Sequence, residues 1–280
     1  MLHTILICIF GKTLAKMKRF LTLIAAASLF VSCGMQLNTT RLMQGAAYAT
    51  QALTLPESEV IAYVQQYITQ LDAQSPVLPE TNAYTKRLRN LTQRLTQIGD
   101  IPLNYKVYQN NEINAFACAD GSVRVYTGIM DLMNDEELLS VIAHEIGHVA
   151  LQHTYKQMRT RMLTSAAFEG VASTSDKVAA LTDSQLGVIG QTLISNHFSK
   201  KQESEADEFS YEFLKAAKRN PWVMVSAFEK LQAVSGAEAA GNSTLGSVAN
   251  LFSTHPDTAT RIKTISTLCQ RDGYERPAAQ

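Results

Sequence analysis

Two histidines and a glutamate stand in the segment His144-Glu145-Ile146-Gly147-His148. On a helix, residues four apart project from the same face, so two neutral imidazoles there can hold a zinc ion from one side. The carboxylate of Glu145, next to the first histidine, can reach a water on the metal rather than the metal itself. The spacing therefore predicts a zinc site that activates water, with Glu145 as its base.

A helix whose histidines are merely packed or exposed is the simpler alternative. Asn134 is a good N-cap and Glu137 follows it by three residues, which predicts a helix start with a capping box. The apolar residues between 138 and 146 predict that this helix is buried. A buried apolar helix rarely carries two histidines and a glutamate without a partner, so the zinc site explains the segment better.

A catalytic zinc normally has three protein ligands and one position open for water. The metzincin pattern, with a glycine and a third histidine soon after the second, is absent because Leu151 and Thr154 stand at those positions. His153 lies five residues after His148, about 140° around the helix, and so points elsewhere. We interpret His153 as a residue that caps the helix or supports a ligand from outside.

The third ligand is expected downstream of this helix. Ser199 and Gln202 form a capping box, and the helix that it opens carries Glu203 and Asp207 on one face. Glu203 can be the third ligand, and Asp207 can accept a hydrogen bond from a ligand imidazole and so fix its tautomer. Glu205 points differently and is expected to be solvated. Acidic helices are common, so this pair gains its weight from the upstream motif, which needs a carboxylate.

Several segments of the chain resemble the HtpX-like zinc peptidases, a family that includes the CAAX prenyl endopeptidases. They are residues 114–117 with 127–128, residues 141–153, residues 203–207 and residues 253–262, within a match of roughly residues 80 to 268. The resemblance implies that His144, His148 and Glu203 are ligands of one Zn²⁺ ion per chain, and that Glu145 is the catalytic base. It also implies a zincin-like metallopeptidase fold of the gluzincin type.

The same resemblance implies a strand that binds substrate. Asn114, Ala115, Phe116 and Ala117 would form an edge strand that pairs with the backbone of an extended polypeptide. An edge offers main-chain hydrogen bonds to any extended peptide, so recognition there would be broad. The alternative is that the strand belongs only to the core of the sheet, with Phe116 as a core residue; alternate residues could serve both purposes.

His255, in the segment Ser253-Thr254-His255-Pro256, has two interpretations. In the resembling family the histidine of this segment lies near the metal, where it either stabilises the tetrahedral intermediate or occupies the metal as a switch, so His255 is a candidate catalytic residue. Taken alone, the residues predict a helix start, with Thr254 as N-cap and Asp257 completing a capping box. Both interpretations can hold.

The surrounding elements follow from the period of the apolar positions. Helical spacing predicts helices at 57–71 and about 81–98, and alternation predicts strands at 103–108, 113–118 and 122–127. Asp120-Gly121 predicts a hairpin turn. The chain after Asn134 is predicted to be helical, with loops near 173–177 and 236–250. We therefore expect an α+β, mostly helical fold with a small three-stranded sheet, in one metallopeptidase domain over residues 57–275.

The first 33 residues are predicted to be a targeting segment. Met17-Lys18-Arg19 precedes an apolar run from 20 to 31, which is shorter than the roughly 20 residues of a membrane span and suits a secretory signal. With Cys33 the segment resembles a bacterial lipoprotein leader, which implies cleavage before Cys33 and a lipid on its sulfur, followed by a tether over 34–56. An ordinary cleaved signal and an uncleaved anchor are the alternatives.

The charge balance bears on binding to nucleic acid, and the cysteines bear on a possible disulfide. The formal net charge is zero, with 25 basic and 25 acidic residues, and gives no basis for binding nucleic acid. Outside the leader, Cys118 and Cys269 could form one disulfide in an oxidising compartment, or remain two buried thiols.

The combined hypothesis is a zinc metalloendopeptidase that cleaves unfolded or misassembled envelope proteins. A lipid would hold it at the periplasmic side of the bacterial envelope, and the outer membrane is the membrane expected to carry this lipid. The alternative function is a chaperone-like factor that works with the assembly machinery of envelope and outer-membrane proteins and has latent protease activity.

Overall fold

The structure is a computed structural model that describes residues 57–157, 198–241 and 246–278, together with 39, 40, 43 and 160. The predicted leader with Cys33, nearly all of the tether and the loop expected near 173–177 lie outside the described residues. Within the described part of the chain, no helix has the length and apolar character that crossing a membrane requires.

Two helices precede the sheet, as predicted, but their ends differ from the prediction. Helix α3 spans Glu57–Gln74, and α4 spans Ala83–Thr92, where the Asn82 side chain accepts a hydrogen bond from the Tyr84 amide and caps the first turn. The prediction that the second helix continues to 98 was wrong. Residues Gln97–Ile98 form β1, which pairs with β2 (Ile101–Pro102) around Gly99, whose positive φ suits a tight turn.

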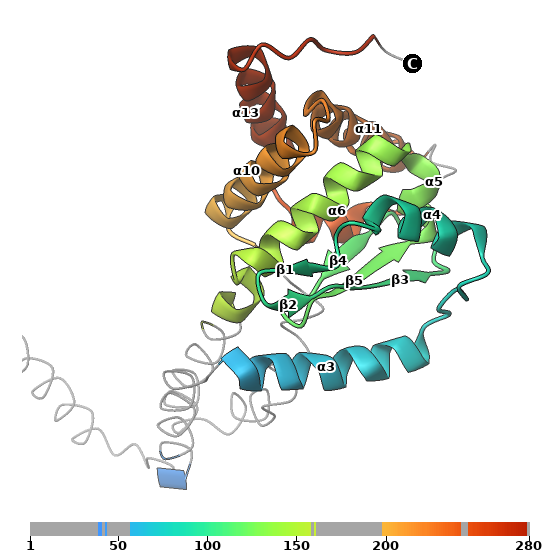
Figure 1. Ribbon diagram of the computed structural model, residues 1–280, viewed down its shortest axis with the longest axis vertical. Coiled ribbons are helices and arrows are strands. Elements are labelled where there is room, and N and C mark those ends of the chain that lie inside the picture. The colour runs from blue at the N-terminus through green and yellow to red at the C-terminus, as the bar shows by residue number, and fades with distance from the viewer. Residues whose placement is uncertain are drawn as a thin grey trace, which may run out of the picture. The chain divides into compact units, whose positions relative to one another are not determined.

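The predicted three-stranded sheet is confirmed, and its strand order is informative. Strands β3 (Asn104–Tyr108), β4 (Ala115–Ala117) and β5 (Ser122–Tyr126) lie in the order β3-β5-β4 (Figure 1). The hairpin of β4 and β5 turns at Gly121, and β3 pairs with β5 in parallel. This order leaves β4 at one edge of the sheet.

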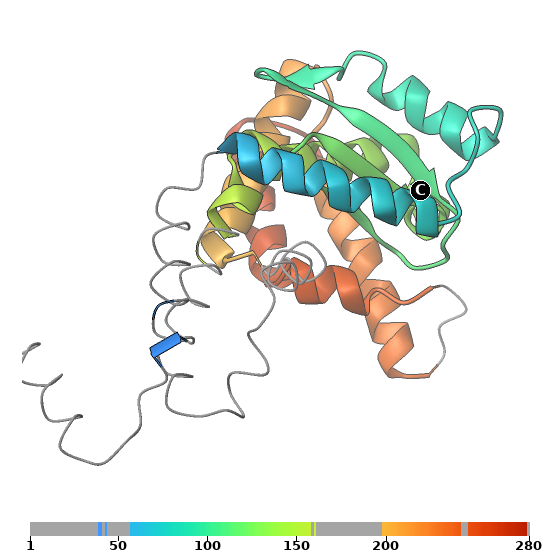
Figure 2. The same cartoon turned by 90° about the horizontal axis from the view of Figure 1, so that it is seen from below.

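Helices form the rest of the described fold. They are α5 (Thr127–Leu132), α6 (Asp135–Ala150), α10 (Lys200–Ala216), α11 (Trp222–Ala239), α12 (Ala249–Thr254) and α13 (Thr258–Arg271). Helix α6 lies between the sheet and the group of α10, α11 and α13, while α3 lies on the opposite side of the sheet (Figures 1 and 2). Both predicted capping boxes are present, at Asn134 with Glu137 and at Ser199 with Gln202. The fold is α+β and mostly helical, as predicted.

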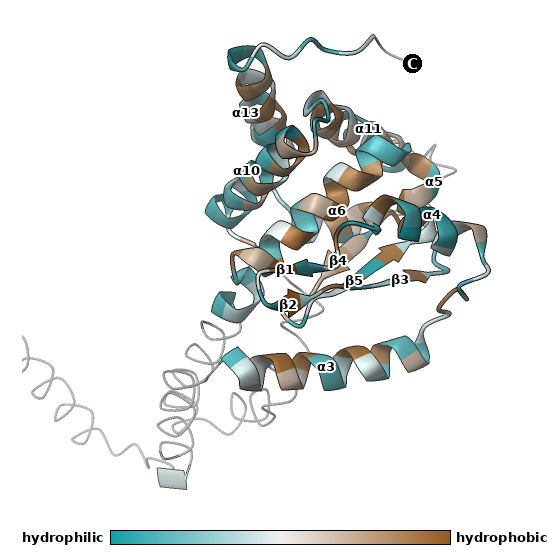
Figure 3. Ribbon diagram, viewed as in Figure 1, coloured by the Kyte–Doolittle hydropathy of each residue, from teal (hydrophilic) through white to brown (hydrophobic). Residues whose placement is uncertain are grey.

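Two apolar clusters hold these layers together. One joins the sheet to α6, α11 and α12 through residues such as Val125, Ile142 and Leu231. The other joins α10, α11 and α13, with Trp222 and Ile265 among its members. Helices α6, α10 and α13 all mix hydrophilic and hydrophobic positions (Figure 3), but on α6 the side chains of Glu137, His144, Glu145 and His148 are buried. Ionisable groups on α6 are therefore largely removed from water.

A buried ion pair fastens the end of α3 to the sheet. The Asp72 carboxylate accepts hydrogen bonds from Nε and Nη2 of Arg124 at 2.8 and 2.9 Å, from Lys106 Nζ at 2.8 Å and from the Tyr108 hydroxyl. Burial raises the pKa of Asp72, but the bonds from Arg124 and Lys106 outweigh it and lower the pKa to about 2.

Cys118 and Cys269 are both buried and free, so the disulfide considered for them is not formed. Burial raises the pKa of both thiols, that of Cys269 to about 11. They therefore behave as small buried apolar residues, and Cys269 belongs to the second apolar cluster.

Candidate active site

Helix α6 presents its two histidines to the same point. The Nε2 atoms of His144 and His148 lie 3.1 Å apart, and both side chains are buried. Gly147 lies between them on the face that meets α10, where a Cβ would stand 3.2 Å from the Cα and carbonyl oxygen of Ala206. The missing side chain lets α10 approach α6 closely, which brings the first turn of α10 beside the histidines.

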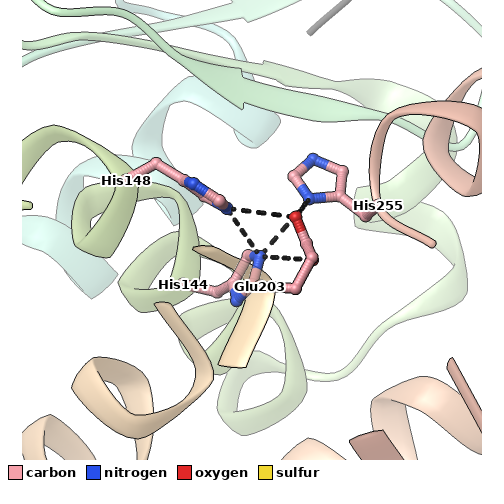
Figure 4. Close-up of side chains that lie close together, drawn as sticks. All are labelled: His144, His148, Glu203 and His255. Atoms are coloured by element: carbon pink, nitrogen blue, oxygen red, sulfur yellow. Dashed lines mark hydrogen bonds and ion pairs between the residues drawn. The ribbon is translucent and has the colours of Figure 1, made fainter. Parts of the chain in front are cut away.

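Glu203 and His255 complete a cluster of four buried side chains. Glu203 comes from the first turn of α10 and His255 from the residue after α12, and both point towards the histidines of α6 (Figure 4). One ligand atom from each of the four lies within 4.8 Å of all the others. The structure thus brings together the three residues predicted as ligands and adds a fourth.

Several of the spacings between these atoms are close to those around a single tetrahedral ion, and all of them lie within 4.8 Å. Donors about 2.0–2.1 Å from a zinc ion at tetrahedral corners lie about 3.3 Å from one another. Glu203 Oε1 is 3.5 Å from His148 Nε2 and 3.0 Å from His255 Nδ1, and His255 Nδ1 is 3.4 Å from His144 Nε2. The donor set of imidazole nitrogens and one carboxylate suits a divalent metal such as zinc.

Glu203 also has an oxygen without a hydrogen bond. Its Oε2 atom is buried and accepts no hydrogen bond from any described residue, although Nη1 of Arg261 forms an ion pair with it at 2.7 Å. These two atoms are close, but their geometry is not that of a hydrogen bond. Arg261 and Glu203 are therefore held together by the attraction between their charges. This attraction holds the Glu203 carboxylate so that its other oxygen, Oε1, lies near His148 and His255.

Asp207 and Arg261 support the cluster from behind His144. The Asp207 carboxylate lies 3.0 Å from His144 Nδ1 and forms a bidentate pair with Arg261, at 2.8 Å to Nε and 2.6 Å to Nη2. Asp207 thus stands where the sequence predicted it. The role of Arg261 was not predicted, because its charge meets both carboxylates only through the packing of α13 on α10; its one signal was its place in the segment 253–262.

His148 is held by a second chain of contacts. Its Nδ1 atom lies 2.9 Å from Nδ1 of His153, whose Nε2 lies 3.1 Å from Oε2 of Glu205. If His148 Nε2 faces the cluster with its lone pair, its proton is on Nδ1 and is donated to His153, which in turn donates from Nε2 to Glu205. The Phe198 ring stacks on His148 with centroids 3.7 Å apart. Together these contacts fix the plane of the imidazole.

This arrangement supports one interpretation and extends another. His153 contacts the ring of His148 from outside the cluster, as expected of a supporting residue. The Glu205 side chain lies outside the cluster and is 39% exposed, in line with the expectation that it is solvated. Its carboxylate also bonds a histidine that lies 52 positions away in the chain, and local spacing along the helix could not predict that contact.

Glu145 lies beside the cluster without joining it. Its carboxylate accepts a hydrogen bond from the Ala117 backbone, and its Oε1 lies 3.5 Å from Nε2 of His255. Burial raises the pKa of this carboxyl group, although the neighbouring histidines oppose the shift. The position is the one predicted for a group that acts on water or substrate rather than on the metal.

The predicted substrate strand, Asn114 to Ala117, contains β4 at the sheet edge. Hydrogen bonds from the Tyr126 amide to Asn114 O and from the Cys118 amide to Ser122 O frame the hairpin. In an antiparallel ladder such pairs alternate, so Phe116 is bonded to β5, while the amides and carbonyls of Ala115 and Ala117 point away from β5. Both alanines are nevertheless buried and belong to the first apolar cluster. The Phe116 side chain packs in T-shaped contacts against Tyr108 and Tyr126, so it also serves the sheet.

His255 does not start a helix. It follows α12, whose last residue, Thr254, bonds its hydroxyl back to the carbonyl oxygens of Asn250 and Leu251. Helix α13 begins at Thr258, after Asp257 in a left-handed conformation. The prediction of Thr254 as an N-cap was therefore wrong, because its hydroxyl satisfies the end of the preceding helix.

The charges in the cluster depend on one another. Burial and the charge of Arg261 lower the pKa of His144, but contacts with Asp207 and Glu203 outweigh them and raise it to about 9. Burial and the charge of His144 lower the pKa of His148. For Glu203, burial acts upward, yet the charges and hydrogen bonds of His255 and His144 hold the pKa well below its usual range. Glu203 is thus ionised, the state that a metal ligand needs.

The segment of the chain that matches a known protein family includes all four residues of the cluster. The model of peptidase family M48 matches residues 82–269. Metalloprotease LoiP of Escherichia coli (strain K12) is 34% identical over 261 residues, covering 93% of this chain and 100% of that protein. Metalloprotease YcaL of the same strain is 34% identical over 251 residues, covering 89% and 95%. The beta-barrel assembly-enhancing protease of that strain is 30% identical over 209 residues, covering 66% of this chain and 42% of that protein.

Proposed function

The chain belongs to peptidase family M48, and on that basis we propose that it is a zinc-dependent endopeptidase acting on unfolded or misassembled envelope polypeptides. The observation that carries the proposal is the buried cluster of three histidines and Glu203, with Glu145 next to it. A metallopeptidase needs a metal held by protein ligands and a base within reach of the attacked bond.

His144, His148 and Glu203 are proposed as the ligands of one zinc ion. They come from two helices that pack closely at Gly147, so the ion would also join α6 to α10. Asp207 and the pair of His153 with Glu205 would orient the two imidazoles through their Nδ1 atoms. Contacts of this kind fix the tautomer of a ligand histidine and raise its basicity.

The proposed reaction is hydrolysis of an internal peptide bond. A zinc ion held by His144, His148 and Glu203 would supply Lewis acidity, which would polarise the scissile carbonyl and lower the pKa of water to about 7. Glu145 takes a proton from the attacking water and passes it to the nitrogen of the leaving amine. The Ala117 amide, which donates to Glu145, holds the carboxylate in place between β4 and the cluster.

His255 has two proposed roles, and the geometry favours one. With its Nδ1 atom 3.0 Å from Glu203 Oε1 and 3.4 Å from His144 Nε2, the side chain fills the corner that a catalytic zinc leaves open. This supports a latent form in which His255 must leave before substrate binds. In the other role, His255 stabilises the charge that develops on the carbonyl oxygen.

The substrate backbone is proposed to lie along β4. The amides and carbonyls of Ala115 and Ala117 that face away from β5 belong to an edge with which no other described strand pairs, and Glu145 reaches the end of that edge. Both alanines are buried, at 1% and 3% exposed, so the edge must be uncovered before a substrate can pair with it. An extended polypeptide can add there as a further strand, whatever its sequence. Unfolded proteins present such extended segments, which is why they are the proposed substrates.

Lipid anchoring is proposed from the leader. A lipid on Cys33 would hold the domain at the periplasmic side of the envelope, with the outer membrane as the expected site. The relative named as a beta-barrel assembly-enhancing protease supports a link to the assembly machinery of the envelope. A chaperone-like role with occasional proteolysis remains the second candidate function, since the same edge strand could hold an unfolded chain without cutting it.

Cleavage of unfolded casein by the zinc-loaded protein tests the proposed function. The wild type should cut casein, and the Glu145→Gln variant should lose the activity by about 10²-fold or more while it retains zinc. Cleavage by Glu145→Gln at the wild-type rate would refute Glu145 as the base. Two results together would favour the chaperone-like function. The wild type would cut no unfolded protein, and the Glu145→Gln variant would still repair the envelope defect of the test strain.

A further inference from the structure

The edge of β4 that faces away from β5 carries a row of three backbone amides, at Ile113, Ala115 and Ala117. Ile113 precedes the strand, but its side chain is buried in the first apolar cluster together with those of the two alanines. Side chains alternate between the faces of a strand, and backbone amides alternate between its edges. The alternation of β4 therefore extends back to Ile113, whose amide faces the same edge as the other two.

The first and last amides of this row are engaged. The Ile113 amide donates to the carbonyl oxygen of Ser247 at 3.0 Å, and the Ala117 amide donates to the Glu145 carboxylate. The Ala115 amide between them has no hydrogen-bond partner among the described residues. Ser247 thus takes the place that a carbonyl of an added strand would occupy opposite Ile113.

The close approach of Ser247 to this row depends on the glycine before it. A Cβ at Gly246 would overlap the carbonyl oxygen of Asn111, two residues before Ile113. A Cβ at Gly128 would overlap the same oxygen from another segment. The backbones around Asn111 can therefore pack this closely only because both positions are glycine.

Polar side chains fasten the same segment. The Ser247 hydroxyl donates to Oε1 of Glu238 at 2.6 Å, and the Val248 amide donates to Oε2 of that carboxylate at 3.2 Å. The side-chain amide of Asn250 donates to Oε1 of Glu112 at 2.7 Å. Val248 is also buried in the first apolar cluster. These contacts fix the segment on two sides.

We propose that Ser247 is the end stop of the substrate-binding edge, so that an extended polypeptide pairs with β4 only between Ile113 and Ala117. The inference rests on the proposed endopeptidase function and adds a limit to the length of substrate backbone that is bound. Ala115 is buried, so the pairing follows the uncovering of this edge. The contacts that fix Ser247 lie at the start of α12, whereas His255 follows its end, so His255 can leave the metal corner while the stop stays in place.

A stop at this place restricts how a substrate binds. In antiparallel pairing, one substrate residue exchanges both of its backbone hydrogen bonds with Ala115. The next residue that could do so, two positions along, would have to face Ile113, where Ser247 already lies. The chain must therefore turn away from the edge. Few backbone bonds mean weak binding, and a short edge cannot add long strands of unfolded protein. The stop thus favours cleavage and release over the holding of unfolded chains.

Peptides that carry one N-methyl group test the stop. A peptide with a single cleaved bond, located by mass spectrometry, is methylated on each backbone nitrogen in turn, and kcat/KM is measured with the zinc-loaded wild type. On one side of the bond, methylation about two residues away should lower kcat/KM at least tenfold, because the Ala115 carbonyl loses its partner. Methylation two residues farther along should change kcat/KM less than about twofold, since Ser247 prevents pairing there.

The variant Gly246→Ala should move the stop, because its Cβ cannot coexist with the present position of Asn111. The Ile113 amide then becomes free for substrate. Methylation at the farther position should now lower kcat/KM at least fivefold, and KM for the unmodified peptide should fall. The matched control is Gly236→Ala on α11, where an added Cβ meets no neighbouring atom within 4 Å. This control should keep the wild-type pattern.

If Gly246→Ala does not fold, Glu238→Ala releases the Ser247 hydroxyl and the Val248 amide and should produce the same change. Three results would overturn the stop: a wild type sensitive at the farther position, a wild type sensitive at neither position, and a folded variant with the wild-type pattern. If the wild type cuts no peptide, the proposed function fails separately. Binding of the same peptides to the zinc-loaded protein then decides, with a tenfold loss of affinity at one position only if the inference is right.

Discussion

The Asp207 carboxylate lies 3.0 Å from Nδ1 of His144 and accepts two hydrogen bonds from Arg261. One buried acid thus orients a candidate metal ligand and is itself fixed by a buried cation. Arg261 also pairs with Glu203. These contacts therefore join α10 and α13 to His144 of α6 behind the metal site.

Replacing Asp207 by Asn should weaken zinc binding by about 10- to 100-fold, because the imidazole of His144 loses a charged partner that fixes its tautomer. Competition with a fluorescent chelator measures the zinc affinity directly. Glu208→Gln is the matched control, because this exposed neighbour on α10 contacts neither histidine. Equal zinc affinity of Asp207→Asn and the wild type would remove Asp207 from the account of the metal site.

The chain of His148, His153 and Glu205 can be tested at its middle residue. His153→Leu removes the acceptor for His148 Nδ1 and should lower zinc affinity about tenfold or more. His153→Asn can keep an oxygen near the position of Nδ1, without the link to Glu205, so its loss should be smaller. Nitrogen NMR of His148 should report the tautomer protonated at Nδ1 in the wild type. Protonation at Nε2 in the zinc-loaded protein would contradict this order of hydrogen bonds.

His255→Ala should raise the rate of casein cleavage if the side chain blocks the open corner of the metal site. The expected rise is several-fold, since the remaining ligands His144, His148 and Glu203 can still hold the ion. Initial rates at equal zinc content provide the measurement. A loss of activity of 10²-fold or more would instead assign His255 to stabilisation of the transition state.

Asp72→Asn should lower the free energy of unfolding at neutral pH by about 3 kcal/mol, because it leaves the buried Arg124 guanidinium without its charged partner. Urea unfolding followed by circular dichroism gives the difference. Glu80→Gln removes a largely exposed ion pair with Arg89 and should change stability by less than about 1 kcal/mol. A loss for Asp72→Asn no larger than that of the control would mean that this pair does not fasten α3.

The same pair predicts a dependence on pH. The folded state lowers the pKa of Asp72 to about 2, below the ordinary value of 3.8. The stability that its charge provides is therefore present above about pH 4 and disappears as the pH falls through about 2. The difference between wild type and Asp72→Asn should be constant from pH 7 to 5 and shrink below pH 4. A difference that grew in acid would contradict the assigned direction of the shift.

The sequence predicted those parts of the site that local geometry determines. His144 and His148 are one helical turn apart on α6, and the capping box at Ser199 places Glu203 and Asp207 on one face of α10. These spacings do not depend on tertiary packing. The resemblance to the HtpX-like peptidases is confirmed by the family match and by an HtpX protease among the similar proteins.

Contacts between distant segments could not be predicted from the sequence, and the reason is the same for each. Arg261 reaches Asp207 across 54 positions, and Glu205 reaches His153 across 52, so no helical period could reveal either pair. Alternation predicted the strands but not their order, because the parallel pairing of β3 with β5 depends on the path of the chain between them. Residues 97–98 joined a short strand, since their pairing with 101–102 overrides a weak helical pattern.

The zinc content of Glu203→Ala tests the central claim most directly, which is that His144, His148 and Glu203 hold one ion. Each protein is loaded with zinc, dialysed and analysed by mass spectrometry for metal per chain. The wild type and Glu145→Gln should each retain one zinc per chain, and Glu203→Ala should retain well under half of that. Full zinc content in folded Glu203→Ala, or no zinc in the wild type, would contradict the account.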